Sequence, residues 1–252
     1  MPDAIVLAGG PAEPGLDPGV PNKAFISIAG RPLVVYVEAA LRAAPAVGRI
    51  AAVGPVEPLR RVLADDVLLV SAAGEIMENV ERAAGELQTH DPIIVAAADI
   101  PLLTGEVVTE FLAACAGGTA DFYYPIVPRD VMERQFPTAR KTFVTLLDGT
   151  FCGGSMILFN PKVIDRVRPF VERVIAARKK PWLLAQMFGW ATVMKFASNR
   201  LSIDEIVTRA TEVVGIPVQP VIIARPELAL DVDAGKPENL QAIRTALVNR
   251  AS

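Results

Sequence analysis

The sequence predicts an α/β protein with three layers, in which helices cover both faces of a mostly parallel sheet. Two observations predict this fold class. Apolar strands and amphipathic helices alternate through the first half of the chain, as they do in α/β folds. The strands are continuous apolar runs rather than alternating apolar and polar residues, which is typical of strands buried on both faces. The length of 252 residues fits one large domain.

The first half of the chain contains the clearest elements. A buried strand at residues 4–8 stops at Gly9-Gly10, and a proline-rich loop follows it. Pro32 suits the first turn of a helix, and Thr104 suits the N-cap of another. We expect further strands at 49–53, 67–70, 93–98 and 122–127, and helices at 32–44, 57–63, 76–87 and 104–115.

The second half is less regular and richer in helices. Ser202 and Glu205 match a capping box, so a helix should begin there. We interpret the helices at about 160–215 as an insertion within a single domain that spans residues 1–252. We expect strands at 142–147, 151–159 and 218–223, and helices at 162–179, 182–193, 202–213 and 237–247.

The composition excludes several classes of protein. The net charge is −3 and there is no basic stripe, so we do not expect nucleic-acid binding. The two cysteines lack a metal-site spacing, which favours free thiols in a reducing compartment. The sequence has neither the features of a signal peptide nor an apolar run near the ~20 residues of a membrane span. We therefore expect a soluble, cytoplasmic protein. The sequence leaves open whether it forms a homo-oligomer.

Two candidate ligand-binding features follow the first strand. The Gly9-Gly10 turn would let backbone N–H groups approach a ligand closely, although an ordinary turn is the alternative. It matches neither the Walker pattern nor the dinucleotide-binding pattern. Lys23 follows the proline-rich loop, and from there it could reach the phosphates of a nucleotide. A solvated surface lysine is the alternative for that residue.

Three acids provide candidate metal ligands. Asp99 ends an uninterrupted apolar strand, so it should lie at the carboxyl edge of the sheet. Asp231 and Asp233 are one residue apart in an extended segment, where their side chains would point the same way. Mg²⁺ binds one or two carboxylates together with substrate phosphates and water. Asp99 and one acid of this pair would meet that need if they converge.

The order of these features resembles the MobA-like nucleotidyltransferase family. The matching motifs are LAGG, a loop with a lysine, GRPLV, ADIPLL and LDVDAGKPENL, over most of residues 3–129 and again 225–248. The resemblance implies a Rossmann-like, glycosyltransferase-A-like fold. It implies catalytic roles for Lys23 and Asp99, and a Mg²⁺ site at Asp99 and Asp233, with Asp231 as the rival ligand. The nucleotide-binding residues that we expect are Leu7, Ala8, Gly9, Gly10, Lys23, Asn79 and Ala98.

The chain also departs from the family pattern. Residues 11–22 contain no arginine, whereas active members carry an Arg-Met-Gly or similar element there. The loss of such a cation slows phosphoryl transfer by several orders of magnitude in other enzymes. The final acidic motif is also extended by Gly235-Lys236.

The expected function is Mg²⁺-dependent transfer of a nucleotidyl group from a nucleoside triphosphate to a phosphorylated or hydroxyl-bearing small-molecule acceptor, with release of pyrophosphate. A molybdenum-cofactor guanylyltransferase is the nearest family analogy. One alternative is a protein that binds a nucleotide or nucleotide-sugar without catalysis. The other is a glycosyltransferase on the same fold.

The insertion also carries basic residues close to two tryptophans. We favour a solvated helix face with aromatic core residues as the interpretation of this group. A lid over an acidic acceptor and a peripheral amphipathic membrane helix are the alternatives. The residues are Arg166, Arg168, Arg173, Arg178, Lys179 and Lys180, near Trp182 and Trp190.

Overall fold

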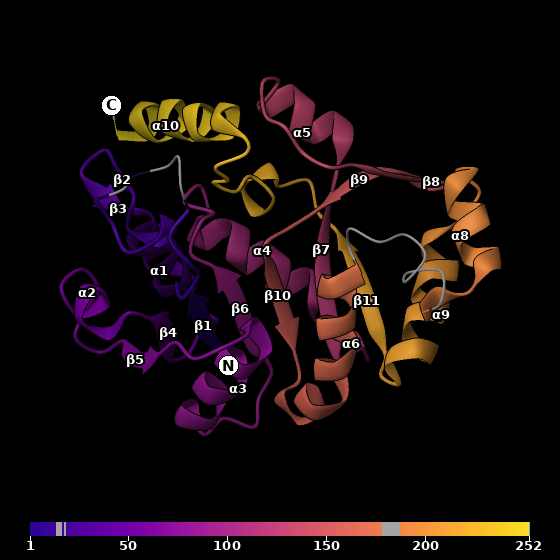
Figure 1. Ribbon diagram of the computed structural model, residues 1–252, viewed down its shortest axis with the longest axis horizontal. Helices are drawn as coiled ribbons and strands as arrows, with labels where there is room; N and C mark the ends of the chain where they lie inside the picture. The colour runs from indigo at the N-terminus through magenta and orange to yellow at the C-terminus, as the bar shows by residue number, and fades with distance from the viewer. Residues whose placement is uncertain (14–16, 18, 178–186, 252) are drawn as a thin grey trace.

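A nine-stranded sheet is the centre of the computed structural model, which describes residues 1–13, 17, 19–177 and 187–251. Helices flank this sheet on both sides (Figure 1). The arrangement confirms the predicted Rossmann-like α/β fold, with a mixed but mostly parallel sheet.

The N-terminal part of the sheet is entirely parallel. Its strands lie in the order β5 (Leu68–Ser71), β4 (Ile50–Gly54), β1 (Asp3–Leu7) and β6 (Ile93–Ala97). Because these strands run in one direction, their carboxyl ends meet at one edge. This edge is where α/β folds bind ligands.

The other part of the sheet is mixed. β10 (Met156–Phe159) is antiparallel to both β6 and β7 (Phe122–Pro128). β11 (Val218–Ile222) is parallel to β7. β9 (Gly149–Gly153) pairs antiparallel with β7 and with the short β8 (Val144–Leu146). β7 therefore holds three strands together.

The single strand predicted at residues 151–159 is wrong, because the chain forms β9 and β10 with a corner between them. The backbone N–H of Gly154 donates to the carbonyl of Pro125 at 2.9 Å, and that of Ser155 donates to the carbonyl of Leu228 at 2.8 Å. A Cβ at Gly154 would lie 2.9 Å from the Pro125 side chain. The chain therefore changes direction at Gly153-Gly154, where contacts with Pro125 and Leu228 hold the corner between β9 and β10.

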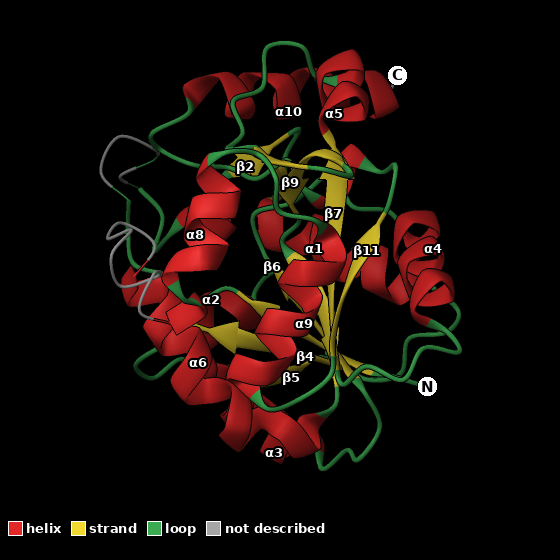
Figure 2. Ribbon diagram, turned by 90° about the vertical axis from the view of Figure 1, so that its right-hand side faces the viewer, coloured by secondary structure: helices red, strands yellow, loops and turns green. Residues whose placement is uncertain are grey.

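One face of the sheet is covered by α1 (Leu33–Ala43) and α4 (Gly105–Cys115). α10 (Pro237–Ala251) adds side chains to the same core from the carboxyl edge of the sheet (Figures 1 and 2). Ala4 and Val6 of β1 point into this layer and are fully buried. Thr104 accepts a hydrogen bond from the backbone of α4, which confirms it as the N-cap. The apolar spacing of the predicted first helix matches the buried face of α1.

The opposite face is covered by α3 (Ile76–Leu87), α6 (Ile164–Ala177) and α9 (Ile203–Val214). Ile5 of β1 points into this second core, on the other side from its neighbours in the strand. Figure 2 views the strands from the side and shows α4 and α6 on opposite sides of them. The two cores give the three predicted layers.

Several shorter elements differ from the prediction. The helix expected at 57–63 ends earlier, and residues 182–186 of the helix expected at 182–193 lie outside the described residues. Gly189 has a φ of +86°, which separates residues 187–188 from α8 (Trp190–Ala197). The other elements are η1 (Lys23–Phe25), β2 (Ser27–Ile28), β3 (Arg31–Pro32), α2 (Val56–Arg60), α5 (Arg129–Gln135), η2 (Pro161–Val163) and η3 (Pro226–Leu228).

The basic residues of the insertion do not surround an aromatic core. Trp190 is 66% exposed, which contradicts its expected place in the core. Arg168 forms an ion pair with Glu81 of α3. Among the described residues, no helix is both long and apolar enough to cross a bilayer. Arg178, Lys179, Lys180 and Trp182 lie outside the described residues.

The capping box of α9 provides a test of this helix. Ser202 accepts from the backbone of Glu205, and the Glu205 carboxylate accepts from the backbone of Ser202, as the sequence predicted. Ser202→Ala should lower the free energy of unfolding by about 0.5–2 kcal/mol, measured by urea denaturation. Thr208→Ala, at an exposed position of the same helix, is the control. An equal loss in both variants would contradict the role of the cap.

Candidate functional site

A cleft of about 600 Å³ lies at the carboxyl edge of β1, β4 and β6. The turn after β1, the N-terminal part of α3 and the segment after β6 form its walls. All of the expected nucleotide-binding residues line this one cleft: Leu7, Ala8, Gly9, Gly10, Lys23, Asn79 and Ala98. Asp99 lines it as well.

The two glycines of the turn have different roles. A Cβ at Gly9 would lie 2.7 Å from the Cβ of Ala72, so this glycine allows the turn to pack against the segment after β5. A Cβ at Gly10 would meet no atom of the described residues within 4 Å. The lack of a side chain at Gly10 therefore leaves space in the cleft. The lack of one at Gly9 allows the turn to pack closely against Ala72.

Asn79 shapes the opposite wall. Its side-chain oxygen accepts a hydrogen bond from the backbone N–H of Ala73 at 2.7 Å. This bond ties α3 to the segment that brings Gly74 and Glu75 to the cleft. Asn79 thus lies where the prediction placed it, and it also positions its neighbours.

Asn22 is a site residue that the sequence analysis missed. It is 5% exposed, and its side-chain amide donates to the carbonyl of Ala8 at 2.8 Å. The side-chain oxygen accepts from the backbone N–H of Ala24 at 2.9 Å, which caps η1. Asn22 therefore fastens the turn that carries Lys23 to the end of β1. Its position directly before the lysine was the available signal.

Lys23 and Asp99 form the central ion pair of the cleft. The Lys23 ammonium lies 2.6 Å from Asp99 Oδ2 and 3.3 Å from Glu13 Oε1. Burial lowers the pKa of Lys23, but the charges and hydrogen bonds of Asp99 and Glu13 outweigh it and raise the pKa to about 12. Glu13 was not predicted, and it brings an acid into the loop that lacks an arginine.

Asp99 is 7% exposed, although it is a charged residue at the edge of the sheet. Burial raises the pKa of its carboxyl, and the charge of Lys23 opposes this rise. Its Oδ1 is buried and has no hydrogen-bond partner among the described residues. An unpaired buried oxygen is costly, so this atom is suited to a cation or a donor from a ligand.

The segment with the other two acids lies beside Asp99. The backbone N–H of Val232 donates to the carbonyl of Asp99 at 3.0 Å, and the Lys23 ammonium donates to the carbonyl of Val232 at 3.4 Å. The charge of Asp231 raises the pKa of Asp99, and the charge of Lys23 contributes to lowering that of Asp233. The backbone of this segment therefore lies against Asp99, whereas the lining of the cleft includes neither Asp231 nor Asp233. Their convergence with Asp99 at one metal ion stays a prediction.

The two acids differ in their partners. Asp233 accepts from the backbone of Gly235 at 2.8 Å and pairs with Lys236 at 3.2 Å. Asp231 pairs with Lys141 at 2.6 Å. Within the described part of the chain, no three His, Cys, Asp or Glu side chains form a ready metal-binding group. A Mg²⁺ that is held by two carboxylates and by substrate phosphates does not need a third protein carboxylate.

Lys141 is a second residue that the sequence analysis missed. Its side chain is only 10% exposed, and it is held by Asp231. Burial raises the pKa of the Cys152 thiol, and the charge of Lys141 opposes this rise. Cys152 is a buried, free thiol. Lys141 lies between the predicted motifs, so no local pattern marks it.

The comparisons with known proteins agree with this geometry. Residues 4–147 match the model of a family described as a MobA-like NTP transferase domain. A hypothetical transferase from Thermus thermophilus is 34% identical, with a TM-score of 0.83 over 92% of this chain and 96% of that one. A search of curated proteins finds no match.

Two more distant structures share the fold. One is a CMP:2-keto-3-deoxy-manno-octonic acid synthetase in complex with CTP, 10% identical, with a TM-score of 0.63 over 99% of this chain and 100% of that one. The other is a homologue, from Mycobacterium sp. strain JC1, of a Mycobacterium tuberculosis protein. It is 16% identical, with a TM-score of 0.56 over 98% of this chain and 96% of that one.

The ion pair predicts how stability depends on pH. Lys23→Met leaves the buried Asp99 carboxylate without its cation, so the pKa of Asp99 should rise further above its unfolded value. The native state then binds a proton that the unfolded state releases, and its stability falls as pH rises. At pH 8 the loss should approach the about 3–5 kcal/mol of a broken buried pair, and at pH 5 it should be smaller.

Urea denaturation at both pH values measures this difference. Lys162→Met, at an exposed position, is the control and should have little effect at either pH. A larger loss for Lys23→Met at pH 5 than at pH 8 would contradict the assignment.

Proposed function

Because the chain belongs to the MobA-like NTP transferase family and is a nucleotidyltransferase, we propose that its cleft binds a nucleoside triphosphate with Mg²⁺ and transfers the nucleotidyl group to a small-molecule acceptor. The observation that carries this proposal is the buried carboxylate of Asp99. It lines the cleft and contacts Lys23, and one of its oxygens has no hydrogen-bond partner in the described part of the chain.

The base and sugar would lie along the turn after β1, against Leu7, Ala8 and Gly10 on one side and Asn79 and Ala98 on the other. These groups are mostly backbone and small side chains, which allow close approach of a ligand. Lys23 would bind the phosphates. Its ammonium is already held at the carboxylate, so a bound triphosphate would find the cation in place.

The donor set fits a magnesium ion. No residue that the structure describes donates a hydrogen bond to Asp99 Oδ1, and Mg²⁺ prefers oxygen ligands. We propose Asp233 as the second ligand, because its ion pair with Lys236 at 3.2 Å is longer than the pair of Asp231 with Lys141 at 2.6 Å. The pKa of Asp233 is lowered, first by its hydrogen bond from the backbone of Gly235, so its carboxylate is ionised at neutral pH. Bound there, Mg²⁺ would supply positive charge against the phosphates.

In the transfer itself, an acceptor oxygen attacks the α-phosphorus of the triphosphate in line with the bond that breaks. The bond from the α-phosphorus to the bridging oxygen of the β-phosphate is lost, and pyrophosphate leaves. Lys23 would offset the charge that develops on the phosphates. Lys141 would bind a phosphorylated acceptor, since it is a nearly buried cation beside Asp231.

A second candidate function is nucleotide binding without transfer. The loop from the glycines to Lys23 has no arginine, and it places the acid Glu13 at 3.3 Å from Lys23 inside the cleft. An acid at this position competes with the phosphates for the lysine. A rise in melting temperature with a triphosphate, without pyrophosphate release for any acceptor, would favour this candidate.

Replacement of Asp99 tests the proposed function. Asp99→Asn removes the charge at nearly constant shape, and it should lower Mg²⁺-dependent pyrophosphate release at least about 100-fold. The fold should be retained, as measured by circular dichroism. The exposed Asp65→Asn is the control. Unchanged turnover in Asp99→Asn would refute the assignment of this residue.

A comparison of the other two acids tests the second metal ligand. Asp233→Asn should raise the Mg²⁺ concentration needed for half-maximal activity by about tenfold or more. Asp231→Asn should instead raise the KM for a phosphorylated acceptor, because Lys141 loses the carboxylate that holds its ammonium in position. Mg²⁺ titrations of both variants at a fixed nucleotide concentration measure the difference. The reverse pattern would assign the metal to Asp231.

A further inference from the structure

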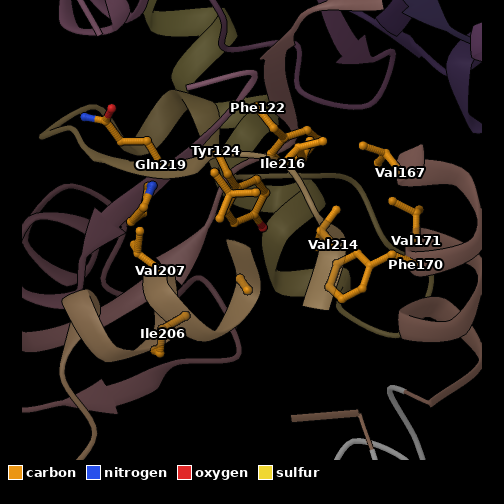
Figure 3. Close-up of a pocket in the computed structure, with 13 residues that line it drawn as sticks. Phe122, Tyr124, Val167, Phe170, Val171, Ile206, Val207, Val214, Ile216 and Gln219 are labelled. Carbon is orange, nitrogen blue, oxygen red and sulfur yellow. The ribbon is translucent and has the colours of Figure 1, made fainter. Parts of the chain in front are cut away.

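Two apolar cavities lie on the face of the sheet that α3, α6 and α9 cover. One has a volume of about 210 Å³ and lies between α3 and α6. The other has a volume of about 200 Å³ and lies between α6 and α9, where Figure 3 shows Phe122, Phe170 and Val214 among its walls. Side chains of this kind offer no partner to a phosphate. The charged groups that a phosphate needs lie instead in the cleft at the carboxyl edge of β1, where Glu13 and Lys23 meet.

The two oxygens of the Glu13 carboxylate contact donors from different parts of the chain. Oε1 lies 3.3 Å from the Lys23 ammonium, and Oε2 accepts a hydrogen bond from the backbone N–H of Ala234 at 3.3 Å. Lys23 follows β1 and Ala234 follows β11, so these donors meet only in the folded chain. Glu13 itself lines the cleft, and its carboxylate therefore connects the cleft to the segment of Ala234.

An ammonium and a backbone N–H that converge on one anion form the kind of site that binds phosphate oxygens in proteins. A carboxylate resembles a phosphate in its negative charge and in its paired acceptor oxygens. Residues 11–22 contain neither Lys nor Arg, so this loop brings a negative charge to Lys23 and no second cation. The contacts of Glu13 are therefore those of an anion site whose occupant belongs to the chain itself.

Glu13 can leave this position at a small cost. Its side chain is 28% exposed, and its oxygen lies 3.3 Å from the Lys23 ammonium, whereas the oxygen of Asp99 lies 2.6 Å away. Partly exposed ion pairs contribute little to stability. Because Asp99 still holds the ammonium when Glu13 moves away, Lys23 remains in place for a phosphate.

A role as a metal ligand is the alternative for Glu13. Within the part of the chain that the structure describes, however, the acids do not form a group of three that could hold a metal ion. The oxygens of Glu13 also face an ammonium and a backbone N–H, which are donors rather than ligands of a cation. Both observations favour competition with an anion.

We propose that the Lys23 ammonium and the backbone N–H of Ala234 form a phosphate subsite, which the Glu13 carboxylate occupies until a triphosphate displaces it. This inference rests on the proposed function. No covalent bond changes in the exchange, because one anion leaves two donors and another takes them. A carboxylate tethered in the chain has an effective concentration on the order of millimolar, so monoanions at lower concentrations do not replace it. Glu13 thus selects ligands with several negative charges.

The test measures the affinity of the full chain for inorganic triphosphate by calorimetry in the presence of Mg²⁺. This probe has neither base nor sugar, so it reports on the phosphate subsites alone. Glu13→Gln removes the competing carboxylate and a like charge beside the ligand, and it should bind inorganic triphosphate about tenfold more tightly than the wild type. Circular dichroism checks that the variant is folded.

Two further variants separate competition for the donors from a general effect of charge. Glu75 is exposed and lines the same cleft on the side of α3, so Glu75→Gln removes the same charge without freeing Lys23. It should change the affinity by less than about threefold. Glu13→Asp keeps the charge but is one methylene shorter, so it cannot bridge both donors and should bind more tightly than the wild type.

Several results would overturn the inference. They are an unchanged or weaker affinity in Glu13→Gln, equal gains in Glu13→Gln and Glu75→Gln, and wild-type affinity in Glu13→Asp. A lack of measurable binding of inorganic triphosphate in every form of the protein would overturn it as well. If Glu13→Gln does not fold, the comparison of Glu13→Asp with the wild type decides the question.

The outcome is separable from that of the proposed function. A thermal-shift panel of the common nucleoside triphosphates with Mg²⁺ is run on the same samples. A nucleotide response with no gain in Glu13→Gln overturns the inference alone. A gain for inorganic triphosphate with no nucleotide response in any variant overturns the proposed function and leaves the subsite as one for inorganic polyanions.

Discussion

The ion pair between Lys23 and Asp99 joins two parts of the chain that meet only at the carboxyl edge of the sheet. Asp99 follows β6, and Asn22 holds Lys23 over it by a hydrogen bond to the end of β1. A buried carboxylate without a cation would be costly, so the charge that we assign to phosphate binding also holds the turn at residues 22–25 in place. The shape of the cleft and its chemistry therefore depend on one contact.

The sequence was sufficient for the fold and for the principal residues of the cleft. Continuous apolar runs identified the parallel strands, and the parallel arrangement implied that Asp99 would lie near the Gly9-Gly10 turn. Local chemistry also located the start of α9, because the capping box at Ser202 depends only on residues within one helical turn. Structural features that depend on a local or a periodic pattern of residues can therefore be predicted from the sequence.

Features that depend on tertiary contacts could not be predicted. The corner at Gly154 exists because its backbone meets Pro125, which is distant in the sequence. Lys141 is placed by an ion pair with Asp231, ninety residues away, and its own segment has no recognisable pattern. The apolar cavities were also invisible, because the spacing of apolar residues indicates which face is buried and does not indicate where the packing leaves space.

The hydrogen bond from Val232 to Asp99 joins the segment after β11 to the cleft. The order in which the chain is synthesised therefore determines when these parts can meet. The glycine turn, Lys23 and Asp99 all precede β7 in the chain, whereas the segment of Asp231 and Asp233 follows β11. A nascent chain emerging from the ribosome would form most of the parallel sheet before that segment is available. The acids that we propose as metal ligands can therefore reach Asp99 only after β11 has been synthesised.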